Sequence, residues 1–189
     1  MNELLKNGRG FIIVIFLLAL VPASGCGLVR PYKCNSDFEQ NIFNIASRNI
    51  HPDDVRVMPK EYLHNAVVAW AGTIIECTIS EKEDEADARL LVEHHHFDWL
   101  EDFKLGENIF ILSARGEGSF KTVWPLRLDY GMEELKRWTA KGNMVVIYGM
   151  PVSVENGIIE LEANCVRFIL PGRFKFADIP YGRDAGWQY

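Results

Sequence analysis

Three consecutive histidines, His94-His95-His96, form the most conspicuous polar run in the chain. On a strand, His94, His96 and Asp98 would point to one face and His95 to the other, because successive strand side chains alternate. Two imidazoles and a carboxylate could hold zinc or copper and leave one position open. The same imidazoles, which titrate at about pH 6.5, could instead respond to pH, or form a polar face at a sheet edge. No spaced partner motif such as HExxH accompanies them, so metal binding is the weaker interpretation.

The sequence contains no further pattern that indicates catalysis. Three pairs of carboxylates lie close in sequence: Glu101/Asp102, Glu133/Glu134 and Glu160/Glu162. Nothing around them indicates the pocket that would shift one pKa away from the other, as acid–base catalysis requires. Ser113 and Ser119 lie near glycines but without a GxSxG motif, and Gly116-x-Gly118 lacks the further glycine and the lysine of a phosphate-binding loop. We therefore predict no enzyme, no catalytic residue and no cofactor.

The elements that must position these residues are mostly strands. Residues 144–169 show a period of two on both sides of Glu155-Asn156-Gly157, which is the pattern of a β-hairpin. Strands are also predicted at 67–79, 89–99 and 108–114, with an extension at 120–128. Gly72 indicates a bulge or bend in the first of these, and residues 115–119 indicate a glycine-rich turn.

Two helices are predicted between and before the strands. Residues 131–141 place acidic side chains first and basic ones last, which suits the helix dipole, and Leu135 and Trp138 would face the core. A short helix over 36–47 would be capped by Ser36 or Asn35, with Phe38, Ile42, Ile45 and Ala46 on its apolar side.

This order of elements predicts a mainly β fold, a small five-stranded OB-like barrel. Three strands, a helix and two strands is the OB arrangement, with the helix between strands three and four and the first strand beside the fourth. We expect a signal peptide at 1–25, a tether and lead-in segment at 26–60, the barrel domain at 61–172 and an aromatic C-terminal tail at 173–189. That tail could cover the barrel or fray.

The N-terminal residues predict export and lipidation. Lys6 and Arg9 precede the apolar run at residues 11–21, which as a helix would span only about 16 Å, half the hydrocarbon thickness of a bilayer. Such a run favours an export signal over a permanent span. Ala23-Ser24-Gly25-Cys26 resembles a bacterial lipobox, which implies cleavage before Cys26 and acylation of that cysteine. An ordinary secretory signal with a chance cysteine is the alternative.

Charge excludes one class of partner. Removing Glu3, Lys6 and Arg9 with the signal changes the net charge from −6 for the whole chain to −7. An acidic domain gains nothing from counterion release, which provides most of the free energy of non-specific binding to nucleic acid. We therefore predict no nucleic-acid partner and a membrane contact through the lipid. The tryptophans would form core or a surface for a protein, peptide or glycan: Trp70, Trp99, Trp124 and Trp138.

Lipidation of Cys26 would leave three cysteines, Cys34, Cys77 and Cys165. Cys77 and Cys165 both fall at inward positions of predicted strands. A Cys77–Cys165 disulfide and two small buried thiols are both consistent with this pattern. Cys34 lies in the predicted tether and would be free.

Several of these features together resemble the Slp family of outer-membrane lipoproteins. They are the lipobox at Cys26, the strand with Gly72, the Gly116/Gly118 segment leading to Trp124-Pro125-Leu126, and residues 145–149 followed by Leu161-Glu162-Ala163. The resemblance covers roughly 67–169 plus the signal. It implies an OB-type barrel held at the periplasmic face of the outer membrane and an association with starvation and envelope stress. Gly27 after the cysteine likewise resembles lipoproteins passed to the outer membrane. The resemblance brings no catalytic residues.

The sequence thus predicts a non-enzymatic, lipid-anchored lipoprotein of the outer membrane that faces the periplasm. Its role would be structural, stress-related or the binding of a protein or glycan partner in the envelope. The alternative is a periplasmic metal-binding protein or metalloenzyme that uses the His94/His96 face.

Overall fold

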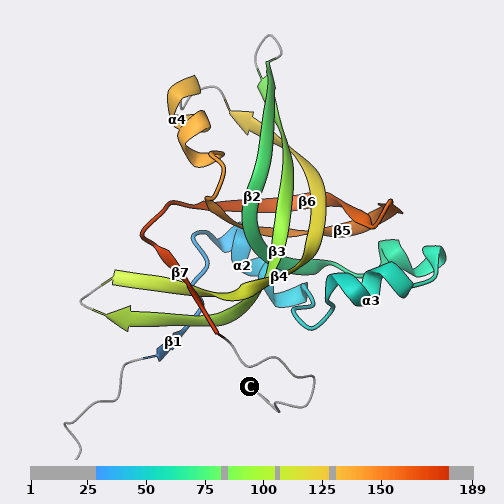
Figure 1. The fold of residues 1–189 in the computed structure, drawn as a ribbon, viewed down its shortest axis with the longest axis horizontal. Coiled ribbons are helices and arrows are strands. Elements are labelled where there is room, and N and C mark those ends of the chain that lie inside the picture. Colours follow the sequence, from blue (N-terminus) through green and yellow to red (C-terminus); the bar gives the residue numbers. More distant parts are fainter. Residues whose placement is uncertain (1–28, 82–84, 105–106, 128–130, 179–189) are drawn as a thin grey trace, which may run out of the picture.

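Five strands close into a mixed β-barrel (Figure 1). The computed structural model describes residues 29–81, 85–104, 107–127 and 131–178. The barrel strands are β2 (Val68–Glu81), β3 (Glu85–Lys104), β4 (Glu107–Arg127), β5 (Met144–Glu155) and β6 (Ile158–Ile169). They neighbour one another in the order β3-β2-β5-β6-β4, and pairing of β3 with β4 closes the ring. The β4–β6 pair is parallel and the other pairs are antiparallel.

This topology confirms the predicted OB-like barrel. The first barrel strand, β2, lies beside the fourth, β5, as predicted. Helix α4 (Met132–Trp138) lies between the third and fourth strands, with Leu135 fully buried. The β5–β6 hairpin turns at Asn156 and Gly157, whose φ angles of 51° and 79° are the left-handed values that this residue pair tolerates best.

Gly72 serves a different purpose from the predicted bulge. The register shift in β2 lies further along, between Ile74 and Glu76. At Gly72 itself a Cβ atom would collide with the backbone carbonyl of Glu93 and would lie 2.6 Å from Cγ1 of Val92. The glycine is therefore needed because β2 and β3 approach each other closely there.

The predicted turn at residues 115–119 is wrong, because β4 continues through it to Arg127. The pairing of β3 with β4 shifts register between Glu93 and His95 and again between His95 and Phe97, opposite this segment. Gly118 has a φ of +98°. The glycines let β4 bend as one long strand. It passes from the barrel wall into a two-stranded β3–β4 ribbon, which projects at the lower left of Figure 1.

Two hydrophobic clusters follow from this bend. The barrel core fills the interior and includes Trp70, Ile74, Leu90, Val92, Phe120, Ile147, Ile159 and Leu161. The lower core consists of Tyr32, Ala46, Ala69, Ala71, Phe97, Phe110, Leu112, Met144, Val146, Tyr148 and Ile169. Trp70 is thus a core residue, and Trp124 and Trp138 pack against the same core, while the side chain of Trp99 lies outside the described residues.

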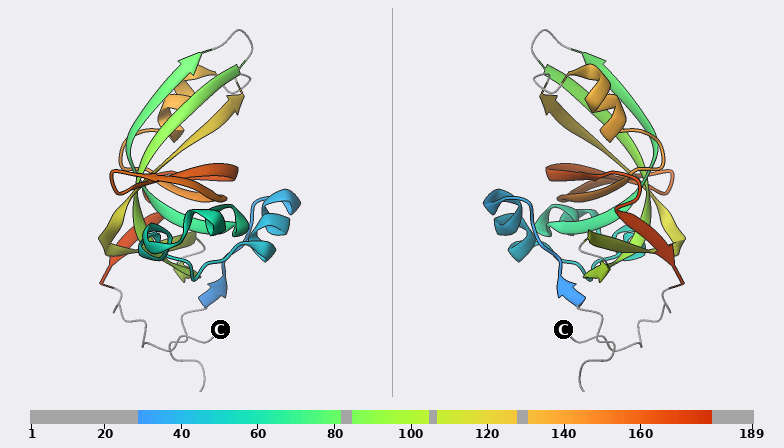
Figure 2. Two further views of the ribbon diagram at one scale, coloured as in Figure 1. Left: turned by 90° about the vertical axis from the view of Figure 1, so that its right-hand side faces the viewer. Right: turned by 90° about the vertical axis from the view of Figure 1, so that its left-hand side faces the viewer.

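The lead-in segment packs against the barrel at the end opposite α4 (Figure 2). It contains β1 (Val29–Pro31), α2 (Asp37–Ile45), α3 (Pro52–Val57) and the 3₁₀ helix η1 (Lys60–Asn65). As predicted, Ser36 caps α2 and accepts a hydrogen bond from the Glu39 backbone N–H.

The predicted apolar side of α2 is correct only for Ile42 and Ala46, which pack in the lower core. Phe38 and Ile45 are 61% and 71% exposed, whereas Glu39 is only 2% exposed. The carboxylate of Glu39 accepts hydrogen bonds from the hydroxyls of Tyr32 (2.6 Å) and Tyr148 (3.0 Å) and from the backbone N–H of Asn35 (2.6 Å). These partners compensate for the loss of water around the charge.

Short strands extend the sheet at both edges of the β3–β4 ribbon. β1 pairs with β3 at Leu100–Asp102, and β7 (Phe174–Ala177) runs parallel to β4 at Phe110–Ser113. The predicted tail therefore begins as a strand, and its residues 179–189 lie outside the described part. Residues 1–28, with the predicted signal and Cys26, also lie outside it. Within the described residues, no helix has the length and apolar character needed to cross a bilayer.

Candidate functional site

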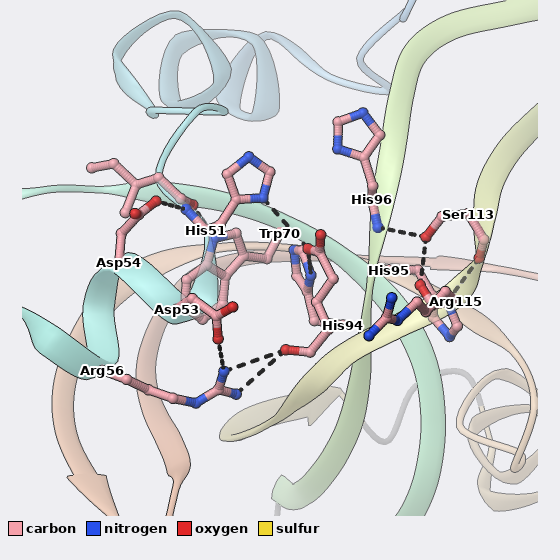
Figure 3. Close-up of polar contacts among 12 residues, drawn as sticks. His51, Asp53, Asp54, Arg56, Trp70, His94, His95, His96, Ser113 and Arg115 are labelled. Atoms are coloured by element: carbon pink, nitrogen blue, oxygen red, sulfur yellow. Dashed lines mark hydrogen bonds and ion pairs between the residues drawn. The ribbon is translucent and has the colours of Figure 1, made fainter. Parts of the chain in front are cut away.

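The histidine run lies where α3 meets the barrel (Figure 3). As the alternation predicted, His94 and His96 share one side of β3, and both rings contact His51, which precedes α3. The His51 and His96 rings stack at a centroid distance of 5.9 Å, and the His51 and His94 rings meet edge to face at 6.3 Å. His94 also contacts Trp70 (5.5 Å) and is only 4% exposed.

Glu117 completes this group of side chains. Its Oε2 atom lies 2.8 Å from Nδ1 of His94 and 3.4 Å from Nδ1 of His51. Nδ1 of His94 has no well-aligned hydrogen-bond partner in the described part of the chain, so its contact with Glu117 is mainly electrostatic. We call His51, His94, His96 and Glu117 the histidine cluster.

Burial and pairing oppose each other in the cluster. Burial lowers the pKa of His94 below its usual 6.5, although the contact with Glu117 and the charge of that carboxylate counteract this. Burial alone would raise the pKa of Glu117, but its contacts with His51 and His94, and the positive charge these imidazoles carry once acid protonates them, outweigh burial and hold that pKa well below 4.5. The cluster therefore contains the ionised carboxylate of Glu117 beside the buried, neutral imidazole of His94. Acid would disrupt this arrangement by protonating the imidazole.

Arg56 of α3 reinforces the same junction. Its guanidinium pairs with Asp53, lies 3.4 Å from the carbonyl oxygen of Glu117, and donates from Nε to the carbonyl oxygen of Gly157 at 3.1 Å. A Cβ atom at Gly118 would collide with the Arg56 guanidinium. The cluster thus connects the lead-in segment to β3 and β4.

His95 lies on the opposite side of β3, as predicted, and makes different contacts. Its Nδ1 donates to the carbonyl oxygen of Ser113 at 2.9 Å, because a carbonyl can only accept. Its Nε2 lies 3.3 Å from the Thr73 hydroxyl, and its ring packs on Phe176 of β7 at 5.2 Å. β7 therefore covers His95, which is 4% exposed.

Ser113, beside His95, bonds to backbone groups. The Ser113 hydroxyl donates to the carbonyl oxygen of Arg115 and accepts from the His96 backbone N–H, so both of these hydrogen bonds join it to backbone groups. The crevice beside His51, Trp70 and His94 has a volume of only about 10 Å³, roughly the room for one water molecule.

The structure brings two of the three metal candidates together. His94 and His96 share a face, but the side chain of Asp98 lies outside the described residues. Among the described side chains, no group of three or more His, Cys, Asp and Glu residues could hold a metal ion. His51 and Glu117 were missed in the sequence because 66 residues separate them.

A larger concavity lies on the outer face of the barrel. This open groove of about 480 Å³ crosses β2, β3, β4 and β6 and is lined by Glu76, Thr78, Arg89, Leu90, Leu91, Lys121, Thr122, Val123 and Glu160. The strand register brings these lining residues next to one another. Arg89 lies opposite both Thr78 and Val123, and Lys121 lies opposite both Leu91 and Glu160.

The groove carries both charges around an apolar floor. Lys121 forms ion pairs with Glu160 (3.2 Å) and Glu155 (3.6 Å), and Ser153 donates to Glu160. Arg89 is exposed and has no ion pair with a described residue. Val123, which lies opposite Arg89, is 48% exposed. The groove therefore offers one uncommitted cation beside apolar surface.

Cys34, Cys77 and Cys165 are free thiols in this structure, and the positions of Cys77 and Cys165 do not favour the predicted disulfide between them. Cys77 packs against the barrel core, whereas Cys165 packs against the lower core. Between Ala163 and Cys165 the pairing with β5 shifts by one residue, at Tyr148/Gly149. A one-residue shift reverses the side to which each later side chain points, so Cys165 leaves the predicted inward face.

Neither a scan of the chain against protein families nor a search of curated proteins finds a match.

Proposed function

We propose that this protein is a non-enzymatic, lipid-anchored lipoprotein of the outer membrane that faces the periplasm and binds a protein partner. The outer-face groove is the observation that carries the binding role. With about 480 Å³ it has room for side chains of another molecule, whereas the crevice at the histidine cluster is far smaller. The lipobox at Cys26 and the resemblance to the Slp family support the address.

The lining of the groove favours an extended segment of a protein over other partners. It contains no aromatic ring on which a nucleic-acid base would stack. Leu91 and Val123 suit an apolar side chain, and Arg89 suits an acidic one beside it. Because the groove runs across four strands, successive residues of an extended chain would meet different strands.

Photo-crosslinking in whole cells tests this role. A photoreactive residue in place of Val123 should give a discrete adduct with an envelope protein, and the same residue in place of Val57 should not. Val57 is a matched control because it is also an exposed valine, at 83%, but lies on α3 outside the groove.

Charge reversal then identifies the groove itself as the contact. Arg89→Glu should reduce the yield of the Val123 adduct about three- to tenfold, since it replaces an attraction by a repulsion at an exposed site. Equal adduct patterns from positions 123 and 57, or a yield unchanged by Arg89→Glu, would refute a partner in the groove.

A further inference from the structure

Two of the free thiols border the same hydrophobic cluster. Cys34 follows β1 in the lead-in segment, and Cys165 lies in β6, and both pack against the lower core. Both side chains are of intermediate exposure. Cys77, in contrast, borders the barrel core.

Arg167 holds the backbone next to Cys34 against β6. Its Nη1 atom donates to the carbonyl oxygen of Lys33 at 2.8 Å, and its guanidinium lies over the Tyr32 ring at 4.9 Å from the centroid. Arg167 and Cys165 are two residues apart in an unshifted part of β6, so they share one face of the sheet. The segment 32–34 therefore lies against the face from which Cys165 projects.

The electrostatics of the two thiols agree with this proximity. The pKa of each thiol is raised to about 11, chiefly by burial and also by the charge of Glu39, while Arg167 acts in the opposite direction on both. Cys34 itself adds to the rise at Cys165. The two thiols therefore respond to the same two charged side chains, Glu39 and Arg167.

We propose that Cys34 and Cys165 form a disulfide when the protein meets a disulfide oxidant such as oxidised glutathione or an envelope thiol oxidase. One thiolate attacks the oxidant disulfide and gives a mixed disulfide, with one oxidant sulfur leaving as a thiolate. The second cysteine thiolate then attacks the protein sulfur and releases the other oxidant sulfur. The cysteines lose two electrons and two protons in total, and the oxidant becomes two thiols.

This bridge would connect the residues after the predicted lipid anchor directly to the last barrel strand. Cross-linking across nearly the whole barrel sequence restricts the unfolded chain strongly and so stabilises the fold. Because the thiolate is the attacking species, the raised pKa values make the uncatalysed reaction slow near neutral pH. Its rate should therefore rise with pH and with an enzymatic oxidant.

The test uses the full chain in detergent with Cys26→Ser, so its outcome does not depend on lipidation. After oxidation by oxidised glutathione at pH 8, peptide mapping without reductant should show one linked pair, Cys34 with Cys165, and an alkylatable Cys77. The oxidised protein should be lighter by two hydrogen atoms, and its thermal midpoint should rise by several degrees and return on reduction.

Single variants separate this bridge from the other pairings. Cys77→Ser should leave the linked pair intact, while Cys34→Ser should abolish it without touching the barrel strands. Three alkylatable thiols in folded, oxidant-treated protein, or a linked peptide that contains Cys77, would overturn the proposal.

Discussion

Acid should destabilise the protein through His94, and a single substitution should remove most of that sensitivity. His94 is 4% exposed, and its pKa in the folded protein is lowered from 6.5 chiefly by burial. The unfolded chain therefore binds a proton at a pH where the folded protein does not. Stability is thus full above the unfolded pKa of 6.5 and declines as the pH falls below it.

The size of the effect follows from this linkage. If His94 stays neutral in the folded state, lowering the pH from 7.5 to 5.5 costs about 1.4 kcal/mol of unfolding free energy. Glu117 adds a separate loss at lower pH. Its folded pKa lies below 4.5, so its contribution is present above 4.5 and declines as the pH falls below that value.

Urea unfolding at pH 7.5, 6.5 and 5.5 measures this effect in the wild type, His94→Gln and His64→Gln. His64→Gln is the matched control, because that histidine is exposed and lies outside the histidine cluster. We expect the wild type and His64→Gln to lose stability in parallel and His94→Gln to lose about 1 kcal/mol less over this range. The comparison uses the change of unfolding free energy with pH in each protein, so differences in absolute stability between the variants do not affect it. Parallel slopes in all three proteins would refute the assignment to His94.

Two further predictions concern the packing around the barrel. Glu39→Ala should reduce the unfolding free energy by about 3 kcal/mol, because it removes the acceptor that the hydroxyls of Tyr32 and Tyr148 share and the carboxylate 3.6 Å from the largely buried guanidinium of Arg167. The exposed neighbour Gln40→Ala should change it by less than about 0.5 kcal/mol, and similar losses for both would contradict the role of Glu39. Gly72→Ala should cost about 1–3 kcal/mol, because the new methyl group meets the rigid backbone of β3. Gly172→Ala meets no atom within 4 Å and should cost only about 1 kcal/mol from its positive φ, so a larger loss there than at Gly72 would count against the close approach of β2 and β3.

The parts of the fold that were predictable from sequence depend on local patterns. Asn156-Gly157 determines a hairpin because both residues tolerate positive φ, and the order of strands and helix then favours the OB-like closure. Ser36 was predictable as a helix cap because this contact is also local: its side chain accepts a hydrogen bond from the backbone N–H only three residues further along.

The errors concern contacts between residues far apart in sequence. Glu39 is buried because Tyr148, 109 residues later, supplies a hydroxyl. His51 joins the histidine cluster through Glu117, 66 residues later. Cys165 changes face because β6 slips by one residue against β5, and no local pattern records such a slip. Gly116 and Gly118 resembled a turn because glycine permits both a turn and a bend within a strand.

Attachment to the membrane through Cys26 is the central claim of the proposed function, because it places the groove in the envelope. Mass spectrometry of the protein extracted from membranes in detergent tests it most directly. We predict a chain that begins at Cys26 and is heavier than its sequence by a diacylglycerol and one further acyl group. A chain cleaved elsewhere and carrying no lipid would contradict both the anchor and the outer-membrane address.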